Sequence, residues 1–486
     1  MTTSSHLQVA RSRTGSRTTS GQKVFNTVEA HLPKQTHTQS IEERLKLARS
    51  LRSDCPRKSH AGWKPPRNRH DPVDTLIASS EGRVPHLVPI RYGRMMESPF
   101  AFYRGGAAIM AGDLAHTPST GVPLQICGDC HLLNFGGFAT PERRLVFDIN
   151  DFDETSVGPW EWDIKRLAAS FFIAAQANGF SRDVGRDAAW YATSAYRDRL
   201  IEYGEMPLLE AWYDYLDLHK IIDQIADPTM KKLATSRLRK ATEYTVHTKE
   251  FVKFAVADGL PPRIRDEPPL IYHDDASDAI KNRKVVDRAF AHYRLTLQPQ
   301  RRLLLDRFKI VDVAMKVVGV GSVGTYCGIL LMVSGSGDPL FLQFKEARTS
   351  VIEPYAGASI YKHHGQRVVV GQRMMQSASD IFLGWTRGGT RQFYVRQLRD
   401  AKISPDTTVM KPTNLRNYAK LCGRALARAH ARTGDAVMLG AYLGKGDAFP
   451  DAIASFAAGY ANQNERDHQA LVRAVRQGRV EARVIG

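Results

Sequence analysis

Two hydrophobic patterns alternate along the 486 residues of the chain. Apolar residues recur at helical spacing in three long segments, which we expect to form amphipathic helices: 163–175, 187–206 and 230–254. Runs rich in β-branched and aromatic residues instead predict strands, a short one at 143–147 and three more between 312 and 347. Together the patterns predict an α+β fold, in which a mainly helical region accompanies a smaller strand-rich region.

The segment GDCHLLNFGGFATPERRLVFDINDFDE, residues 128–154, carries the clearest candidate chemistry. Phosphoryl transfer requires a carboxylate beside the acceptor hydroxyl and hard oxygen ligands that hold Mg²⁺ against the phosphates. Kinase catalytic loops place an Asp five residues before a metal-binding Asn, and Asp129 and Asn134 have this spacing. We therefore predict that Asp129 accepts the proton of the acceptor hydroxyl or orients it. His131 joins the catalytic set as a brace of the loop.

Carboxylates that follow the predicted strand complete this candidate site. We predict that Asn134 and Asp151 bind Mg²⁺ and that Asp153 assists them, because carboxylate and amide oxygens are ligands of this ion. Asp148 competes with Asp151 for the metal. Asp151 is preferred because a Phe follows it, as in the Asp-Phe-Gly of kinases.

A second candidate set lies in the strand-rich region. Gly319, Gly321 and Gly324 form a G-x-G-x-x-G turn that also contains Ser322. A dinucleotide-binding turn would need a helix directly after the glycines, whereas the TYCGILLMV that follows here is rich in strand formers. We therefore predict that the turn covers ATP phosphates and that Lys345, at the end of the third strand, neutralises them.

Residues 127–163 resemble the aminoglycoside and choline kinase branch of the protein-kinase-like superfamily. There His-Gly-Asp-x-His-x-x-Asn is followed by Ile-Asp-[Trp/Phe] and by a Tyr-Asp-Leu helix start, for which Asp163 is the matching residue. Cys127 replaces the first His of that pattern. The resemblance implies a two-lobed fold with ATP and Mg²⁺ as cofactors.

The order of these parts implies a circular permutation of the kinase-like fold. The glycine turn follows the catalytic loop here, whereas the usual kinase order is the reverse. Two segments could supply the helix that precedes the loop in small-molecule kinases, 421–435 and 98–116. The glutamate that pairs with the strand lysine would be Glu353, Glu346 or a later residue.

Most of the chain also resembles the uncharacterised bacterial family catalogued as domain of unknown function twenty-two fifty-two. The matching phrases are SPFAFYRG, CGDCHLLNFG, FDINDFDET, GPWEWDIKRLAAS, VVGVGSVGT and YANQNERDH, which lie within residues 90–465. That family implies no substrate, so the expected function rests on the kinase-like residues.

A rival interpretation uses Cys127, Cys130 and His131, which spell the C-x-x-C-H of covalent haem attachment. Haem attachment takes place outside the cytoplasm, and the first residues have no apolar core for export. Redox chemistry or a zinc site would use the same two thiols, but the other three cysteines are scattered. Packing around the loop remains the alternative for both.

Charge separates the N-terminal residues from the rest. Residues 1–70 hold fourteen Lys and Arg against four Asp and Glu, which is +10 of the total +18. We expect a basic, largely disordered tail at 1–80 that could contact nucleic acid or an anionic surface, with a short helix at IEERLKLARSLRS. No apolar run is long enough to span a membrane, and five cysteines suit a reducing compartment, so we expect a cytoplasmic protein.

The expected organisation is therefore a tail and three further regions. Residues 81–300 would hold the catalytic loop and the helical large lobe, 301–400 the small lobe, and 401–486 a helical region that completes the large lobe. The expected function is ATP- and Mg²⁺-dependent phosphoryl transfer to a hydroxyl of a small-molecule acceptor. The alternatives are a nucleotide-binding pseudokinase or regulator and, on the same fold, transfer of AMP.

Overall fold

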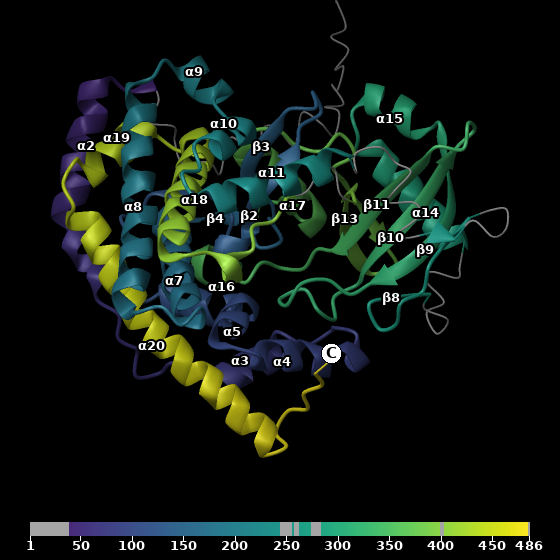
Figure 1. Cartoon of the computed structure of the whole chain (residues 1–486), viewed down its shortest axis with the longest axis horizontal. Helices are drawn as coiled ribbons and strands as arrows, with labels where there is room; N and C mark the ends of the chain where they lie inside the picture. The colour runs from purple at the N-terminus through teal and green to yellow at the C-terminus, as the bar shows by residue number, and fades with distance from the viewer. Residues whose placement is uncertain (1–37, 244–254, 257–261, 274–282, 399–402, 485–486) are drawn as a thin grey trace, which may run out of the picture.

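The computed structural model describes residues 38–243, 255–256, 262–273, 283–398 and 403–484. Helices form one side of the molecule and an antiparallel sheet forms the other (Figure 1). The expected α+β class is confirmed. No helix among the described residues is at once long enough and apolar enough to cross a membrane.

Helices α7 and α8 form the centre of the helical side, packed against each other and against α18 and α20. Nearly all residues of α7 are buried, as expected for a helix that has neighbours all round. The predicted helix 163–175 lies within α7, and the predicted helix 187–206 lies within α8 except for its last residue, Met206. The long helices are α7 (Trp160–Ala177), α8 (Arg182–Glu205), α11 (Pro228–Glu243), α18 (Pro412–Thr433) and α20 (Ala448–Arg476).

The predicted helix 230–254 is described as far as Glu243, and its remaining residues lie outside the described part. Shorter helices surround the central ones. They are α4 (Val88–Met96), α5 (Pro99–Gly105), α6 (Ala107–Leu114), α9 (Leu208–Tyr213), α10 (Leu218–Asp223) and α19 (Ala436–Leu443).

The short helix predicted at IEERLKLARSLRS is confirmed as α2 (Ile41–Asp54), and the rest of the described segment up to residue 80, expected to be largely disordered, is folded as well. Helix α2 begins with a capping box between Ser40 and Glu43 and packs on α19. Helix α3 (Pro72–Ala78) buries Val73 and Leu76 and packs on α20. The correction follows from these apolar contacts, which a count of charges does not reveal. Residues 1–37 lie outside the described residues.

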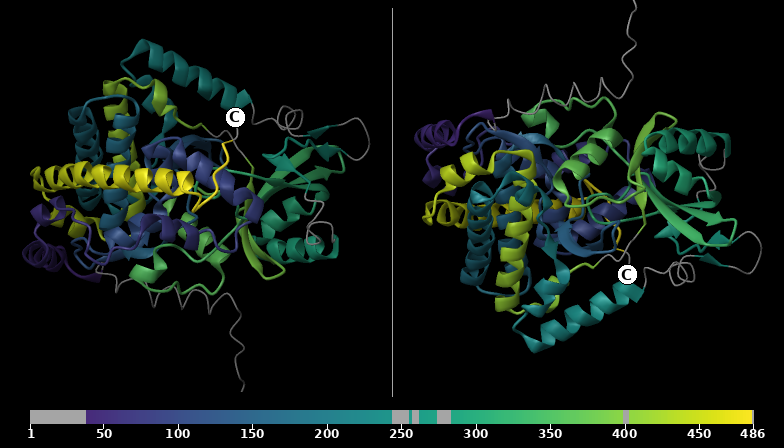
Figure 2. Two further views of the ribbon diagram at one scale, coloured as in Figure 1. Left: turned by 90° about the horizontal axis from the view of Figure 1, so that it is seen from below. Right: turned by 90° about the horizontal axis from the view of Figure 1, so that it is seen from above.

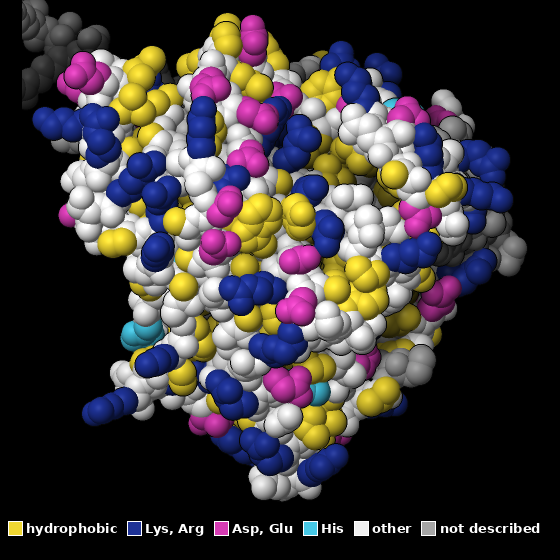
Figure 3. All heavy atoms as spheres, turned by 60° about the vertical axis from the view of Figure 1, so that its left-hand side comes forward, with side chains coloured by type: hydrophobic (Ala, Val, Ile, Leu, Met, Phe, Trp, Pro, Cys, Tyr) yellow, Lys and Arg dark blue, Asp and Glu magenta, His cyan; other side chains and the backbone are white. Residues whose placement is uncertain are grey.

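Basic and acidic side chains are intermingled on the face shown in Figure 3. This mixture accords with the modest charge excess of the chain beyond residue 70. Nothing on that face singles out a continuous basic strip of the kind that binds nucleic acid.

Two small sheets lie within the helical side. Strand β1 (Pro123–Ile126) pairs with β4 (Ser156–Pro159). Strands β2 (Phe135–Ala139) and β3 (Leu145–Ile149) form a hairpin that β5 (Leu216–Asp217) extends. The predicted strand 143–147 corresponds to β3, which begins two residues later. The catalytic-loop candidate therefore leaves one small sheet and enters the other.

The six-stranded sheet is antiparallel throughout, in the order β12-β13-β11-β10-β9-β8. The strands predicted between 312 and 347 are β9, β10 and β11. Helix α14 packs on β12, and α17 packs on β12 and β13 (Figure 2). The bounds are β8 (Ile271–Tyr272), β9 (Phe308–Lys316), β10 (Cys327–Ser334), β11 (Pro339–Glu346), β12 (Gly384–Gly388), β13 (Arg391–Gln397), α14 (Arg283–Leu295), α15 (Pro299–Leu305), α16 (Glu353–Ala356) and α17 (His364–Met375), with a further strand pair β6 (Ala255–Val256) and β7 (Arg263–Ile264).

A buried ion pair joins the β2–β3 hairpin to α18. Arg428 Nη2 lies 2.9 and 2.8 Å from the two carboxylate oxygens of Asp148 and 2.6 Å from the Met375 carbonyl oxygen. The Ser377 amide and hydroxyl donate to the same carboxylate. Asp148 is wholly buried, so its charge depends on these donors.

Replacement of Arg428 by Met is expected to lower the free energy of unfolding by about 3–5 kcal/mol, because it leaves the Asp148 carboxylate buried without its cation. Urea unfolding of the purified protein measures this loss. Arg424→Met is the matched control, since Arg424 is exposed on the same helix. Equal stability of the two variants would contradict the role assigned to the pair.

Candidate functional site

The loop between β1 and β2 brings the first candidate residues together. Gly128 has φ +79°, and a Cβ there would lie 2.3 Å from the Glu154 carbonyl oxygen, so only glycine fits this turn. The Asn134 side-chain amide donates to the Asp129 carbonyl oxygen at 2.7 Å. The Asn150 amide donates to the Asn134 carbonyl oxygen at 2.7 Å, which places the end of the loop beside the end of β3.

One face of α7 holds this loop. The Asp163 carboxylate accepts hydrogen bonds from the backbone amides of Cys127 and Gly128, at 2.8 and 3.0 Å. Ser170 Oγ accepts the Leu132 amide at 3.0 Å. Asp163 and Ser170 are seven residues apart and therefore lie on the same side of the helix. The buried polar face of α7 thus satisfies the backbone of the loop and fixes its shape.

Arg166, on the same face of α7, forms an ion pair with the carboxylate of Asp129 and fixes its orientation. Its Nη2 lies 2.5 Å and its Nε 2.7 Å from Asp129 Oδ1. The guanidinium also stacks on the ring of Tyr103, 4.5 Å from the ring centre. Asp129 is consequently held as an oriented, charge-paired carboxylate. The sequence admits Arg166 either as a phosphate-binding residue or as an ion-pair partner, and the structure shows the ion pair with Asp129.

His131 lies behind Asp129 as a neutral imidazole. Its Nε2 is 4.0 Å from Asp129 Oδ2, and its Nδ1 is buried without a hydrogen-bond partner. Burial lowers the pKa of His131 to about 3, and the nearby Arg104 and Arg166 lower it too, although Asp129 opposes the shift. The geometry suits a side chain that supports the loop.

The second pair of carboxylates meets Lys345 from the six-stranded sheet. Lys345 Nζ lies 2.5 Å from Asp153 Oδ2 and 3.7 Å from Asp151 Oδ1. The Tyr394 hydroxyl donates to Asp153 Oδ1 at 2.5 Å, and the Ser322 hydroxyl donates to Oδ2 at 3.3 Å. Asp151 and Asp153 hold the pKa of the buried Lys345 well above its usual value, although burial by itself would lower it. Asp153 thus joins the two sides of the molecule.

Three residues that were candidates for the metal or for pairing with Lys345 form ion pairs with arginines instead. Asp148 belongs to the buried pair with Arg428, so of the two candidates for the metal only Asp151 lines the cleft. Glu353 lies 3.6 Å from Arg367, and Glu346 lies 2.7 Å from Arg391. Among the described residues, neither glutamate forms an ion pair with Lys345, since each is paired with an arginine.

The glycine turn connects β9 and β10 and faces the catalytic loop. Gly319 and Gly324 have φ +65° and +84°, which glycine adopts without strain. Arg83 donates to the carbonyl oxygens of Gly321 and Val323, at 2.8 and 2.6 Å. These bonds tie the turn to the segment before α4 and hold it over the cleft.

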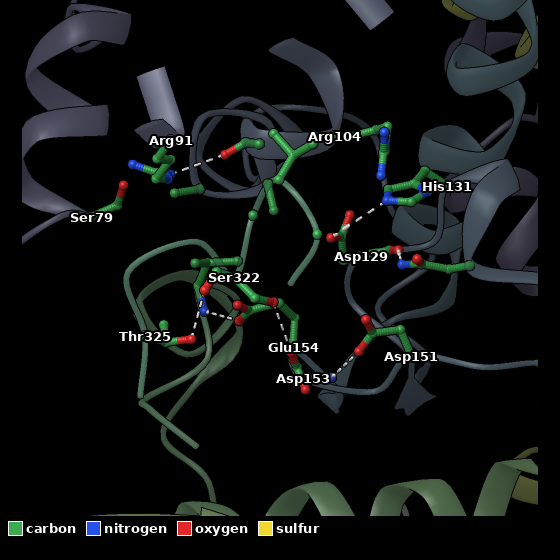
Figure 4. Close-up of a pocket in the computed structure, with 18 of the residues that line it drawn as sticks. Ser79, Arg91, Arg104, Asp129, His131, Asp151, Asp153, Glu154, Ser322 and Thr325 are labelled. Carbon is green, nitrogen blue, oxygen red and sulfur yellow. Dashed lines mark hydrogen bonds and ion pairs between the residues drawn. The ribbon is translucent and has the colours of Figure 1, made fainter. Parts of the chain in front are cut away.

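A single cleft collects most of the candidate residues (Figure 4). Its empty volume is about 1010 Å³, part of which is open to solvent. The candidates that line it are Asp129, His131, Asn134, Asp151, Asp153, Gly319, Gly321 and Ser322. Lys345 lies behind Asp153, and Gly324 lies at the base of the turn. The cleft also has a charged wall, formed by Arg91, Arg104, Glu154 and Arg348.

The two thiols of the C-x-x-C sequence lie beneath the loop. Cys127 and Cys130 are both wholly buried, and burial raises the pKa of Cys130 to about 11. Their sulfur atoms and a carboxylate oxygen of Asp163 all lie within 4.8 Å of one another. That carboxylate already accepts two backbone amides. In this arrangement the thiols are neutral and serve as packing groups of the core.

Substitution of His131 by Gln is expected to reduce the acid sensitivity of the protein. The folded pKa of about 3 lies below the ordinary 6.5, so the unfolded chain binds one more proton between these values. Stability that is complete above about pH 6.5 is thus lost as the pH falls toward 3, at about 1.4 kcal/mol per pH unit for this group.

The measurement is urea unfolding at several pH values between about 4 and 6. The slope of stability against pH should be smaller in His131→Gln by about the contribution of one proton. The exposed His116, replaced by Gln, is the control and should leave the slope unchanged. Equal slopes in wild type and His131→Gln would contradict the buried neutral state.

Of three comparisons with known proteins, one finds a match. The model of a family described as uncharacterized protein conserved in bacteria (DUF2252) matches residues 83–474. Neither a search of curated proteins nor a search of solved structures found a match. The matched residues include both candidate segments and both sides of the cleft. Because the match covers well over half of its residues, the chain belongs to the DUF2252 family.

Proposed function

We propose that this protein is an ATP- and Mg²⁺-dependent phosphotransferase that acts on a hydroxyl group of a small acceptor. The observation that carries the proposal is the convergence of the two candidate sets on one cleft. Lys345 and Asp153 are 192 residues apart in sequence, yet they form an ion pair at its edge. The Asp–Asn loop, the second carboxylate pair, the glycine turn and the lysine are the parts that phosphoryl transfer requires.

The donor set that Asn134 and Asp151 form at the cleft fits Mg²⁺. Asn134 uses its side-chain nitrogen to bind the Asp129 carbonyl oxygen, which leaves its amide oxygen as the group that could meet a cation. Asp151 supplies a carboxylate on the same wall. Both are hard oxygen ligands, which Mg²⁺ prefers. Bound Mg²⁺ and ATP would supply charge neutralisation and the phosphoryl group.

Lys345 and the glycine turn would hold the nucleotide phosphates. The ammonium of Lys345 is fixed by Asp153 at the edge of the cleft, where it contributes positive charge. Gly319 and Gly321 line the cleft, and backbone amides of such a turn would bind phosphate oxygens. Ser322 already joins that turn to Asp153. These groups can position phosphates without forming any covalent bond.

Asp129 would orient the acceptor hydroxyl. Its carboxylate is fixed by Arg166 and lines the cleft. A paired carboxylate is a weak base, but a loose transition state for phosphoryl transfer needs orientation more than strong proton abstraction. Asp163 and Ser170 hold the backbone on which Asp129 stands. The α7 face therefore serves to preorganise the loop.

A permuted kinase-like fold accords with the packing of α18. The Tyr418 hydroxyl donates to the Leu132 carbonyl oxygen of the catalytic loop at 2.6 Å. At the other end of the helix, the Thr433 hydroxyl donates to the Gln125 carbonyl oxygen of β1 at 3.3 Å. A connection from α18 to β1 would restore the usual order of helix and loop. This favours 421–435 over 98–116 as the helix that precedes the loop.

Two observations favour the alternatives of a regulatory protein or an AMP transferase. Lys345 is paired with Asp153, and no described glutamate pairs with it. Asp129 is likewise paired with Arg166. A nucleotide-binding protein without turnover could keep both pairs intact. AMP transfer would use the same groups with the nucleotide bound in the opposite sense, and the mass of its product would identify it.

Mg²⁺-dependent formation of ADP from ATP, with a bacterial metabolite extract as acceptor, tests the proposal. Wild type should form ADP and a product heavier by one phosphate. Asp151→Asn and Lys345→Met should each reduce the rate by about a hundredfold or more, because each removes charge that stabilises the transferred group. Lys309→Met is the control, since Lys309 is exposed on the same sheet.

Three results would count against the proposal. Binding of ATP without turnover of any fraction of the extract would favour the regulatory protein. A product heavier by AMP would establish the other transfer reaction. Failure of wild type to bind ATP in the presence or absence of Mg²⁺ would overturn the nucleotide assignment for both sides of the cleft.

A further inference from the structure

Arg104 is a cation in the cleft that forms no hydrogen bond or ion pair through its guanidinium among the described residues. It lines the cleft together with Asp129 and His131, and Figure 4 shows its side chain extending toward His131. Its Nε is shielded from solvent and has no hydrogen-bond partner. Burial lowers the pKa of Arg104, although Asp129 and Glu97 partly oppose that shift. Arg104 is thus a partly desolvated cation whose Nε lacks a hydrogen-bond acceptor among the described residues.

The other arginines near Arg104 are committed to protein groups. Arg166 is paired with Asp129, and Arg91 donates to Ser80 and to the carbonyl oxygens of Leu76 and Gly105. Arg348 donates to the carbonyl oxygens of Ser79 and Glu81. Since Arg166 already compensates Asp129, Arg104 is not needed for that purpose. Its charge remains available for a ligand.

The helix that carries Arg104 is firmly held. The hydroxyl of the adjacent Tyr103 donates to the Arg166 carbonyl oxygen at 2.7 Å. The Ser98 hydroxyl caps the start of α5 by accepting the Ala101 amide, and the Asn464 side chain donates to the Pro99 carbonyl oxygen at 2.8 Å. A guanidinium on a rigid helix that borders the cleft is preorganised for an external anion.

We propose that Arg104 binds an anionic group of the acceptor, so that the substrate is a small hydroxyl compound that also carries a phosphate or a carboxylate. The inference rests on the proposed function, in which the acceptor binds at the Asp129 end of the cleft and the nucleotide binds at the Lys345 end. A guanidinium forms paired hydrogen bonds with both kinds of oxyanion. The neutral ring of His131 beside it adds no competing charge.

The charge of this wall selects against cationic acceptors. Aminoglycosides and choline, the acceptors that name the kinases resembled by the catalytic loop, are both positively charged. An unpaired arginine at the acceptor end would repel them. The expected substrate class is therefore opposite in charge to that of those kinases, although the groups proposed for phosphoryl transfer are of the same types.

The binding test uses inorganic phosphate as the probe and phosphorus NMR line broadening as the readout, on the full chain, with and without saturating ADP and Mg²⁺. Wild type should bind phosphate in both conditions. Arg104→Gln should weaken this binding at least tenfold, as expected for the loss of a charge-assisted pair. Arg476→Gln, at an exposed position on α20, should leave phosphate binding unchanged.

An activity test uses matched acceptors with and without an anionic group, such as glycerol phosphate against glycerol and glucose phosphate against glucose. The anionic member of at least one pair should be the better acceptor for wild type. Arg104→Gln should remove this preference by raising KM for the anionic compound. Choline and an aminoglycoside should remain poor acceptors for both proteins.

Several outcomes would overturn the inference. One is phosphate binding that is equal in wild type and Arg104→Gln, and another is its absence in wild type. If ADP displaces phosphate and Arg104→Gln lowers ADP affinity, Arg104 contacts the nucleotide instead of the acceptor. Phosphate binding is also measured in the absence of nucleotide. A failure of wild type to bind ATP would therefore contradict the proposed function, while the phosphate measurement would still test Arg104.

Discussion

The cleft depends on the hydrogen bonds between the Asp163 carboxylate and the backbone of the loop after β1. A loop that turns sharply at Gly128 exposes amides that need acceptors, and the interior offers no water to replace a missing one. Asp163 accepts two of these amides from a helix that is itself held on all sides. This fixed turn sets the direction of Asp129. It also packs against Glu154, next to the carboxylate pair Asp151 and Asp153 that follows β3.

A second constraint links the helical side to the sheet. The Asp153 carboxylate receives Lys345 and Tyr394 from two neighbouring strands of the sheet, β11 and β13. Ion pairs of this kind are costly to bury, so their value depends on complete pairing. Arg367 completes the link, because its guanidinium donates to the Asp153 carbonyl oxygen. The cleft consequently lies where both sides contribute charge, and closing or opening it would have to break these contacts.

Charge divides the cleft into two unlike ends. At the sheet end, carboxylates and Lys345 compensate one another, which suits a site for metal and phosphates. At the other end, Asp129 is already neutralised by Arg166, and Arg104 is left over. Membership of the DUF2252 family does not distinguish these ends. The distinction comes from which side chains have protein partners and which do not.

Features that depend on local spacing could be predicted from the order of the residues. The helical period placed α7 and α8, strand-forming runs placed β9, β10 and β11, and the five-residue interval of Asp129 and Asn134 placed both on one short loop. The packing of the folded chain, in contrast, determines that Asp148 lies in the core while Asp151 lines the cleft. It also determines the partner of Lys345, because contacts between residues so far apart depend on how whole elements pack. Periodicity specifies which face of an element is buried, but not which charged group will meet it there.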